Sequence, residues 1–110
     1  MKDLSLKHDK YRKSRGGYSR FLEIHCEKCG NFLAIYQKDG PGPLKRMYLD
    51  RIFSPKSLTD LHKTALKRIP NLVCSHCKQV IGVPFVYKRE QRLAFRLFEG
   101  SIIKKVKKVQ

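Results

Sequence analysis

Two short stretches of this chain, Cys26-Glu-Lys-Cys29-Gly30 and Cys74-Ser-His-Cys77, decide its fold. Each is a CxxC knuckle, a tight turn that holds two thiols on one side of the loop. Two such turns brought together complete a tetrahedral shell of four thiolates, which leaves no position open for a substrate. We therefore predict one structural Zn²⁺, bound by Cys26, Cys29, Cys74 and Cys77, although the ligands by themselves leave iron as an alternative.

The segment between the two knuckles is long. Residues 30–73 separate them, whereas a compact ribbon has roughly 15–20 residues between its cysteine pairs. The insert must therefore form structure of its own. Its first part, residues 32–37, is apolar and forms a hairpin with residues 18–26, and the Asp-Gly and Pro-Gly pairs of residues 38–43 predict a turn.

The remaining apolar runs also predict short strands. Pro84 places part of one of them at a sheet edge or a bulge. The last segment is a strand with a basic fringe or, alternatively, a short basic helix. The further segments expected to be strands are 44–53, 79–87, 92–98 and 101–110.

One helix is expected, at residues 57–69. Ser57 with Asp60 resembles a capping box, and Pro70 would end the helix. The apolar side chains at helical spacing, which would form its buried face, are Leu58, Leu61, Ala65, Leu66 and Ile69. The pattern as a whole predicts a small β-rich α+β zinc domain at residues 18–110.

Residues 1–17 have a different composition. Basic residues dominate this stretch, only Asp3 and Asp9 oppose them, and Gly16-Gly17 closes it. A segment with so few apolar residues cannot bury a face, so we expect a flexible basic arm.

The charge of the chain is its second informative feature. Lys and Arg number 25 and Asp and Glu number 9, which gives a formal net charge of +16. This charge favours a polyanionic partner, of which nucleic acid is the commoner kind and an anionic membrane surface the less common. A basic protein with no such partner is the simpler alternative.

No secretory signal and no membrane-spanning run are visible in the sequence. We therefore expect a cytoplasmic protein that does not associate with membranes. In a reducing compartment, paired CxxC turns favour metal over disulfides.

Basic residues beside aromatic ones predict contacts with nucleic acid, RNA more than DNA, with the ribosome among the candidate partners. Aromatic side chains in strands belong to the core more often than to a stacking surface. The oligomeric state does not follow from the sequence. The residues expected to contact phosphates are Lys10, Arg12, Lys13, Arg15, Lys45, Arg46, Arg51, Lys88, Arg89, Lys104, Lys105, Lys107 and Lys108.

No catalytic motif is recognisable, so we expect a protein that is not an enzyme. Glu23 and His25 stand in the reverse order of the His-x-Glu pair of a zinc deaminase. His25 and His76 flank the cysteines, where a hydrogen bond near the metal or exposure to solvent is expected rather than ligation. The scattered acids Asp39, Asp50 and Glu90 are expected in turns, at the surface or in ion pairs.

The first knuckle with its following hairpin, together with Cys74-x-x-Cys77, resembles the zinc-ribbon group, over roughly residues 20–90. Residues 36–52 look similar to small uncharacterised prokaryotic zinc-binding proteins. Two distant CxxC hairpins also resemble the β-tent fold of methionine sulfoxide reductase B. In that family the zinc is structural and catalysis uses a further cysteine, which this chain lacks.

The sequence thus predicts a non-catalytic structural-zinc protein that binds nucleic acid, with structured RNA the expected ligand. The expected fold is an antiparallel sheet of zinc-ribbon or β-tent type with one helix. A zinc module for protein interaction is one alternative. An enzyme on a β-tent scaffold is another, and it would require a pocket lined by groups such as Glu23, His25 and Asp50.

Overall fold

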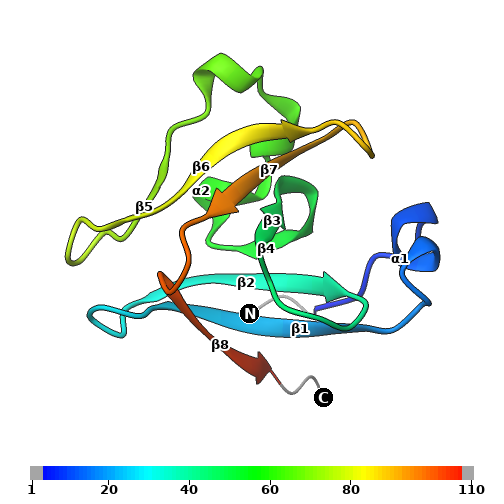
Figure 1. Cartoon of the computed structure of the whole chain (residues 1–110), viewed down its shortest axis with the longest axis horizontal. Coiled ribbons are helices and arrows are strands. Elements are labelled where there is room, and N and C mark those ends of the chain that lie inside the picture. Colours follow the sequence, from blue (N-terminus) through cyan, green and yellow to red (C-terminus); the bar gives the residue numbers. More distant parts are fainter. Residues whose placement is uncertain (1–3, 108–110) are drawn as a thin grey trace.

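The computed structural model describes residues 4–107 of the chain. Two four-stranded sheets lie one above the other, with strand orders β4-β2-β1-β8 and β3-β7-β6-β5 (Figure 1). We call them sheet A and sheet B. All strand pairs between these residues are antiparallel. The predicted class, a small β-rich α+β domain with antiparallel strands, is confirmed.

Sheet A is built around the hairpin predicted on either side of the first CxxC turn. Leu22, Ile24 and Cys26 alternate with partly exposed residues, which directs one face of the hairpin into the interior. The C-terminal segment, expected to be either a strand or a short basic helix, forms a strand in this sheet. The strands are β1 Ser19–Cys26, β2 Phe32–Asp39, β4 Ile52–Ser54 and β8 Ile102–Lys107.

Sheet B carries the second CxxC turn between β5 and β6. Strand β5 pairs with β6 only near Val80 and Gly82, so Pro84 lies where one side of β6 has no partner strand. The missing N–H of the proline therefore costs no ladder hydrogen bond there, as predicted for an edge position. The strands are β3 Arg46–Tyr48, β5 Leu72–Val73, β6 Val80–Tyr87 and β7 Arg92–Leu97.

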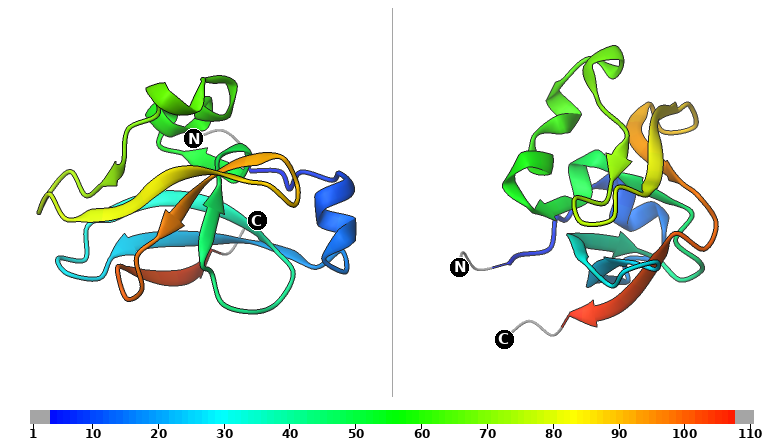
Figure 2. Two further views of the ribbon diagram at one scale, coloured as in Figure 1. Left: turned by 45° about the horizontal axis from the view of Figure 1, so that its top comes forward. Right: turned by 90° about the vertical axis from the view of Figure 1, so that its left-hand side faces the viewer.

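The core lies between the sheets, and both sheets contribute apolar side chains to it. Leu22 and Tyr36 come from sheet A, whereas Met47, Ile81 and Phe95 come from sheet B. The two further views show the sheets as stacked layers (Figure 2). Burial of these apolar side chains is the main stabilising contribution to a domain of this size.

The expected strand at residues 44–53 is in fact two strands in different sheets. β3 pairs with β7 of sheet B, and β4 pairs with β2 of sheet A. The 3₁₀ turn η1, Leu49–Arg51, connects them and buries both Leu49 and Arg51. A single strand cannot serve both sheets, so the chain turns where Arg51 finds carboxylate partners.

The expected helix at residues 57–69 is wrong in its length. A short helix, α2 Lys56–Thr59, is followed by the 3₁₀ turns η2 Leu61–Lys63 and η3 Leu66–Arg68. The predicted capping box does not form, because Pro55 occupies the N-cap position without a side-chain hydrogen bond. A helix of this length is marginal by itself, so the contacts of Leu58, Leu61 and Ile69 with the core decide the path.

Of residues 1–17, expected to be a flexible arm, residues 1–3 lie outside the described residues and residues 4–17 contact the domain in this structure. Residues 4–17 contain a short helix, α1 Lys10–Ser14, capped by the side chain of Asp9. The Asp9 carboxylate also pairs with Arg51, and the backbone of Lys7 exchanges hydrogen bonds with the side chain of Gln37. Within residues 4–107, no helix is both long and apolar enough to cross a membrane.

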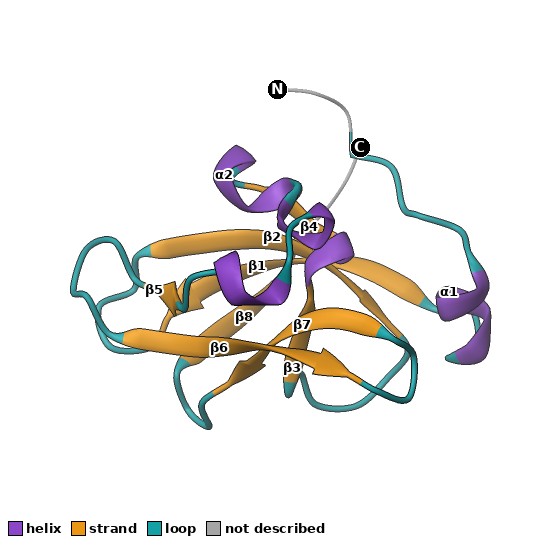
Figure 3. Cartoon of the chain, turned by 90° about the horizontal axis from the view of Figure 1, so that it is seen from above, coloured by secondary structure: helices purple, strands orange, loops and turns teal. Residues whose placement is uncertain are grey.

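The two CxxC turns lie at one end of the molecule. Seen from above, the β1–β2 turn and the β5–β6 turn project on the same side, away from α1 (Figure 3). Residues far apart in the chain thereby meet, since β1 and β5 belong to different sheets.

Candidate metal centre

The four cysteine sulfurs form one cluster, in which every pair of Sγ atoms lies within 4.8 Å. Cys26 Sγ is 3.7 Å from Cys77 Sγ, and Cys29 Sγ is 3.6 Å from Cys74 Sγ. A tetrahedral ion with metal–sulfur bonds of about 2.3 Å needs sulfurs about 3.8 Å apart. These residues therefore fit one metal ion, with one thiol pair from each sheet.

The two CxxC turns have the same backbone hydrogen bonds. In the first, Cys26 N–H donates to Asn31 O and Gly30 N–H donates to Cys26 O, both at 2.8 Å. In the second, Cys74 N–H donates to Gln79 O and Lys78 N–H donates to Cys74 O, both at 2.9 Å. The two turns thus place their thiols in equivalent geometry on either side of the cluster.

The residue after the second cysteine closes each turn in a left-handed conformation. Gly30 has φ 78° and Lys78 has φ 67°. Glycine adopts this conformation freely, whereas a residue with a Cβ is strained there. The first turn therefore has the favourable residue, and the second forms in spite of a lysine.

Backbone amides favour the thiolate form of Cys74. The N–H groups of Cys77 and His76 donate to its sulfur and lower the pKa of this thiol to about 6. The amide of Asn31 adds a contact from the other turn, with Nδ2 at 3.8 Å from Cys74 Sγ. Such donors stabilise a negatively charged sulfur, which is the form that binds metal.

Without a cation, the four thiols cannot all ionise together. The N–H of Asn31 donates to the Cys29 sulfur and lowers its pKa, but desolvation and the three neighbouring sulfurs raise that pKa to about 12. Burial and the crowding of four sulfurs thus disfavour a further negative charge on Cys29. A divalent ion at the centre would stabilise the thiolates, so the cluster is chemically suited to a metal.

A bound metal would act as a cross-link between the sheets. Cys26 and Cys74 are buried, whereas Cys29 is exposed and Cys77 is half-buried. Ser101 joins the same end of the molecule, because its Oγ donates to Ile81 O and its carbonyl accepts from Glu27 N–H. With all four positions of a tetrahedron filled by protein, the ion would stabilise the fold and leave no site for a substrate.

Comparison with protein-family models, curated proteins and solved structures finds no match to this chain. The resemblance to zinc ribbons and to the β-tent fold therefore stays a prediction. What the structure establishes is the cysteine cluster and the β-rich architecture that forms it.

The histidines beside the cysteines do not belong to the cluster. His25 Nδ1 lies 3.2 Å from Gly30 O, and its Nε2 lies 3.2 Å from Glu23 Oε1. His76 contributes its backbone N–H to the Cys74 sulfur. The enzyme alternative requires Glu23, His25 and Asp50 around one pocket. In the structure Glu23 and His25 contact each other, whereas Asp50 pairs with Arg92 of β7 at 2.7 Å.

One of the predicted phosphate contacts is wrong. Arg51 has an exposed side-chain fraction of 1% and pairs with Asp9 at 2.6 Å and with Asp39 at 2.9 Å. A guanidinium that is buried and neutralised in this way cannot reach a phosphate. Of the places expected for the scattered acids, which were turns, the surface or ion pairs, the structure shows ion pairs, since Asp50 and Glu90 also pair with arginines.

The other predicted contacts differ in exposure. Arg15 is half-buried and pairs with Glu90 at 2.8 Å, and Lys108 lies outside the described residues. Arg12, Arg46 and Lys107 are also half-buried. The exposed members are Lys10, Lys13, Lys45, Lys88, Arg89, Lys104 and Lys105.

A cavity of about 740 Å³ brings some of these cations together with aromatic side chains. We call it the basic groove. It lies between β3, β6 and β7 on one side and the segment leading into β8 on the other, and Glu99 is the acid that lines it. Its cations are Lys45, Arg46, Arg96 and Lys104, and its aromatic residues are Phe85, Tyr87 and Phe98.

A second cavity, of about 470 Å³, lies beside the basic groove, and Pro43, Leu44, Lys45 and Arg46 line both. Lys38 lines the smaller cavity and is buried. Sequence reasoning missed Lys38, because a lysine next to Asp39-Gly40 has the composition of a turn. The available signal was the two-residue period of a strand, which places Lys38 on the same face as Tyr36.

Proposed function

We propose that this protein is a non-catalytic, structural-zinc protein that binds nucleic acid through the basic groove. The observation that carries the proposal is the composition of the groove, in which four cations and three aromatic rings face one carboxylate. Cations neutralise phosphates, and aromatic or guanidinium planes stack on unpaired bases.

The stacking groups in the groove are already ordered. The Arg46 guanidinium lies 3.9 Å from the ring centroid of Tyr87, and that of Arg96 lies 4.9 Å from that of Phe85. Phe98 is 52% exposed, so its ring is accessible to a ligand. Flat cationic and aromatic surfaces side by side are suited to a strand whose bases are splayed out.

We propose RNA rather than DNA, and structured RNA with unpaired nucleotides in particular. Unpaired bases in loops and bulges are the usual target of aromatic and arginine stacking. The net charge of +16 supports a large polyanion. Ribosomal RNA is the first candidate ligand, and the cytoplasm is the compartment that this proposal implies.

Zinc is the metal that we propose for the cysteine cluster. Four thiolates without an open position are typical of structural zinc sites, although iron uses the same ligands. In this role the metal would bind no RNA. It would hold sheet A and sheet B together at one end and so maintain the groove between them.

The test is fluorescence-anisotropy binding to a ribosomal RNA hairpin between 50 and 200 mM salt, a range over which phosphate contacts are resolved. The groove variant Lys45→Gln/Arg96→Gln is compared with Lys67→Gln/Arg68→Gln, which removes the same charges from exposed positions of η3. We expect the groove variant to reduce the salt slope by about 1 to 2 and the control to leave it nearly unchanged.

A DNA hairpin of the same sequence and a neutral protein of the same size complete the design. Equal loss in both variants would show that total charge, and not the groove, drives binding. Binding no stronger than that of the neutral protein would overturn the proposal altogether.

A further inference from the structure

The smaller cavity has an unusual buried cation on its floor. Lys38 Nζ donates to Gly40 O at 3.0 Å and to Pro41 O at 3.4 Å, and none of the ion pairs among residues 4–107 involves this lysine. Its exposed fraction is 7%. An ammonium ion that loses water without gaining a carboxylate is costly, so its retention in this cavity calls for an explanation.

A second cation lies directly opposite Lys38. Arg20 on β1 is its partner in the antiparallel register, and Arg20 Nη1 donates to the same Gly40 carbonyl at 3.1 Å. Like charges opposite one another on paired strands are destabilising. Burial first, and then repulsion from Arg20, Lys104 and Arg15, lower the pKa of Lys38. The local field therefore favours an added negative charge.

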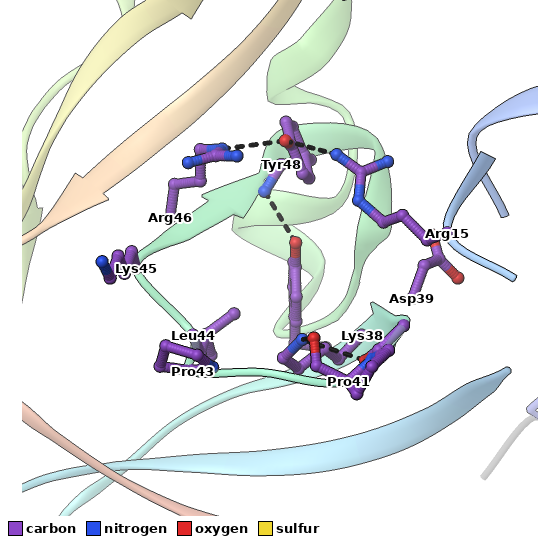
Figure 4. A pocket seen from close by; sticks show the side chains of 11 residues that line it. Arg15, Lys38, Asp39, Pro41, Pro43, Leu44, Lys45, Arg46 and Tyr48 are labelled. Atoms are coloured by element: carbon purple, nitrogen blue, oxygen red, sulfur yellow. Dashed lines mark hydrogen bonds between the residues drawn. The ribbon is translucent and has the colours of Figure 1, made fainter.

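The opposite wall of the cavity presents a hydroxyl group that is free to donate. Tyr48 Oη accepts hydrogen bonds from Arg15 Nη2 and from Arg46 Nε, both at 2.8 Å (Figure 4). Its own proton has no acceptor within hydrogen-bond distance among residues 4–107. A hydroxyl held between two guanidinium groups is well placed to donate to an anion.

The acid in the lining, Asp39, makes its hydrogen bonds with other side chains. Asp39 Oδ1 accepts from Ser19 and Gln37, and its Oδ2 accepts from Arg51. Glu90, which pairs with Arg15, is not among the residues that line the cavity. Lys38 and Arg46 therefore face the cavity without a carboxylate partner among the described residues.

We propose that this cavity is a binding site for one phosphate group, with Lys38 and Tyr48 as donors to its oxygens. A volume of about 470 Å³ exceeds that of a phosphate ion and leaves room for an attached sugar. Since residues 43–46 form a wall shared with the basic groove, a phosphate at the end of an RNA chain is one source, and this source rests on the proposed function. Free phosphate is the other.

The experiment compares the wild-type protein with Lys38→Met, which removes the charge and retains most of the stem. Because Lys38 has only carbonyl partners, we expect this variant to keep or raise its urea midpoint. Tyr48→Phe is the second variant, and Lys67→Met, at an exposed position of η3, is the matched control. Calorimetric titrations use inorganic phosphate and one short RNA with either a 5′-phosphate or a 5′-hydroxyl.

We expect the 5′-phosphate to increase RNA affinity about tenfold in the wild type, as one or two charged hydrogen bonds would. The gain should disappear in Lys38→Met, decrease in Tyr48→Phe and persist in Lys67→Met. Competition of inorganic phosphate with the phosphorylated RNA would assign both sources to this one site.

The outcomes separate the two proposals. If Lys38→Met abolishes binding of inorganic phosphate but no RNA binds to any protein, the phosphate site stands and the proposed function fails. If RNA binds through the groove and the 5′-phosphate gives no gain, or the gain survives in Lys38→Met, the phosphate site is refuted.

Discussion

Arg51 Nε donates to Asp39 Oδ2 at 2.9 Å, and the exposed fractions of these side chains are 1% and 4%. The guanidinium also donates to Asp9 Oδ1 and Oδ2, at 2.6 and 3.0 Å. One buried cation thereby joins strand β2, the turn η1 and the N-terminal segment. The ion pairs of Arg51 therefore hold the N-terminal segment, which has few apolar residues, against the turn η1 that connects the two sheets.

Replacement of Arg51 by methionine should destabilise the protein by about 3–5 kcal/mol, because Asp39 would be left buried and unpaired. Arg68→Met is the matched control at an exposed arginine and should change stability by less than about 0.5 kcal/mol. Urea unfolding of the metal-loaded proteins measures both. Similar midpoints for the two variants would contradict the structural role assigned to the buried pair.

Asp9 should make the stability depend on pH in acid. The hydrogen bond from Arg51 is the largest cause that lowers the pKa of Asp9, from 3.8 to about 2. A carboxyl group with a lowered pKa contributes stability above its unfolded pKa, and this contribution is lost as pH falls through the folded pKa. The advantage of the wild type over Asp9→Asn should therefore be full above about pH 5 and shrink as the pH falls towards about 2.

Urea midpoints of the two proteins measured at matched pH test this expectation. Protons also compete with metal for the thiols, but they do so in both proteins, so the difference isolates Asp9. A difference that stays constant from pH 6 to the acid limit would rule out the ion pair as its source.

Metal removal should unfold or greatly loosen the protein. Elemental analysis should find one equivalent of metal, and a chelator should lower the unfolding temperature until zinc is restored. Cys74→Ser should lose the metal, whereas Ser75→Ala, at an exposed neighbour, should retain it. A stable protein without metal, or an iron spectrum in place of zinc, would refute the corresponding part of the proposal.

The two CxxC turns should respond in opposite ways to exchange of their left-handed residue. Gly30→Ala should destabilise the metal-loaded protein by about 1 kcal/mol, because alanine is strained at φ 78°. No atom lies within 4 Å of a Cβ built at Gly30, so the cost is conformational and not steric. Lys78→Gly should be neutral or stabilising by up to about 1 kcal/mol.

Thermal unfolding of the metal-loaded variants distinguishes these effects. A loss of stability in Gly30→Ala with none in Lys78→Gly is the expected result, and the metal content serves as the control that both turns still bind. If both substitutions destabilise equally, the left-handed conformation of Lys78 is not a source of strain.

The clearest successes of sequence reasoning are local. The CxxC spacing predicted the cysteine cluster, and short apolar runs predicted β1, β2, β6 and β7 close to their observed bounds. Both signals, the CxxC spacing and the apolar runs, depend on residues that are neighbours in the chain. The prediction of a helix at residues 57–69 was wrong in length. A helical segment this short is marginally stable by itself, and the contacts of Leu58, Leu61 and Ile69 with the core favour a different backbone path.

By itself the sequence determined that this chain has four thiols in two equivalent turns, a large positive charge and a β-rich core. Only the tertiary structure decided that Arg51 is buried and that Lys38 lies with Tyr48 around a cavity. Charge and residue type follow from composition, whereas exposure and partners depend on strand register and on how the two sheets pack. A lysine or arginine therefore becomes a structural ion pair or a ligand site only once the fold has formed.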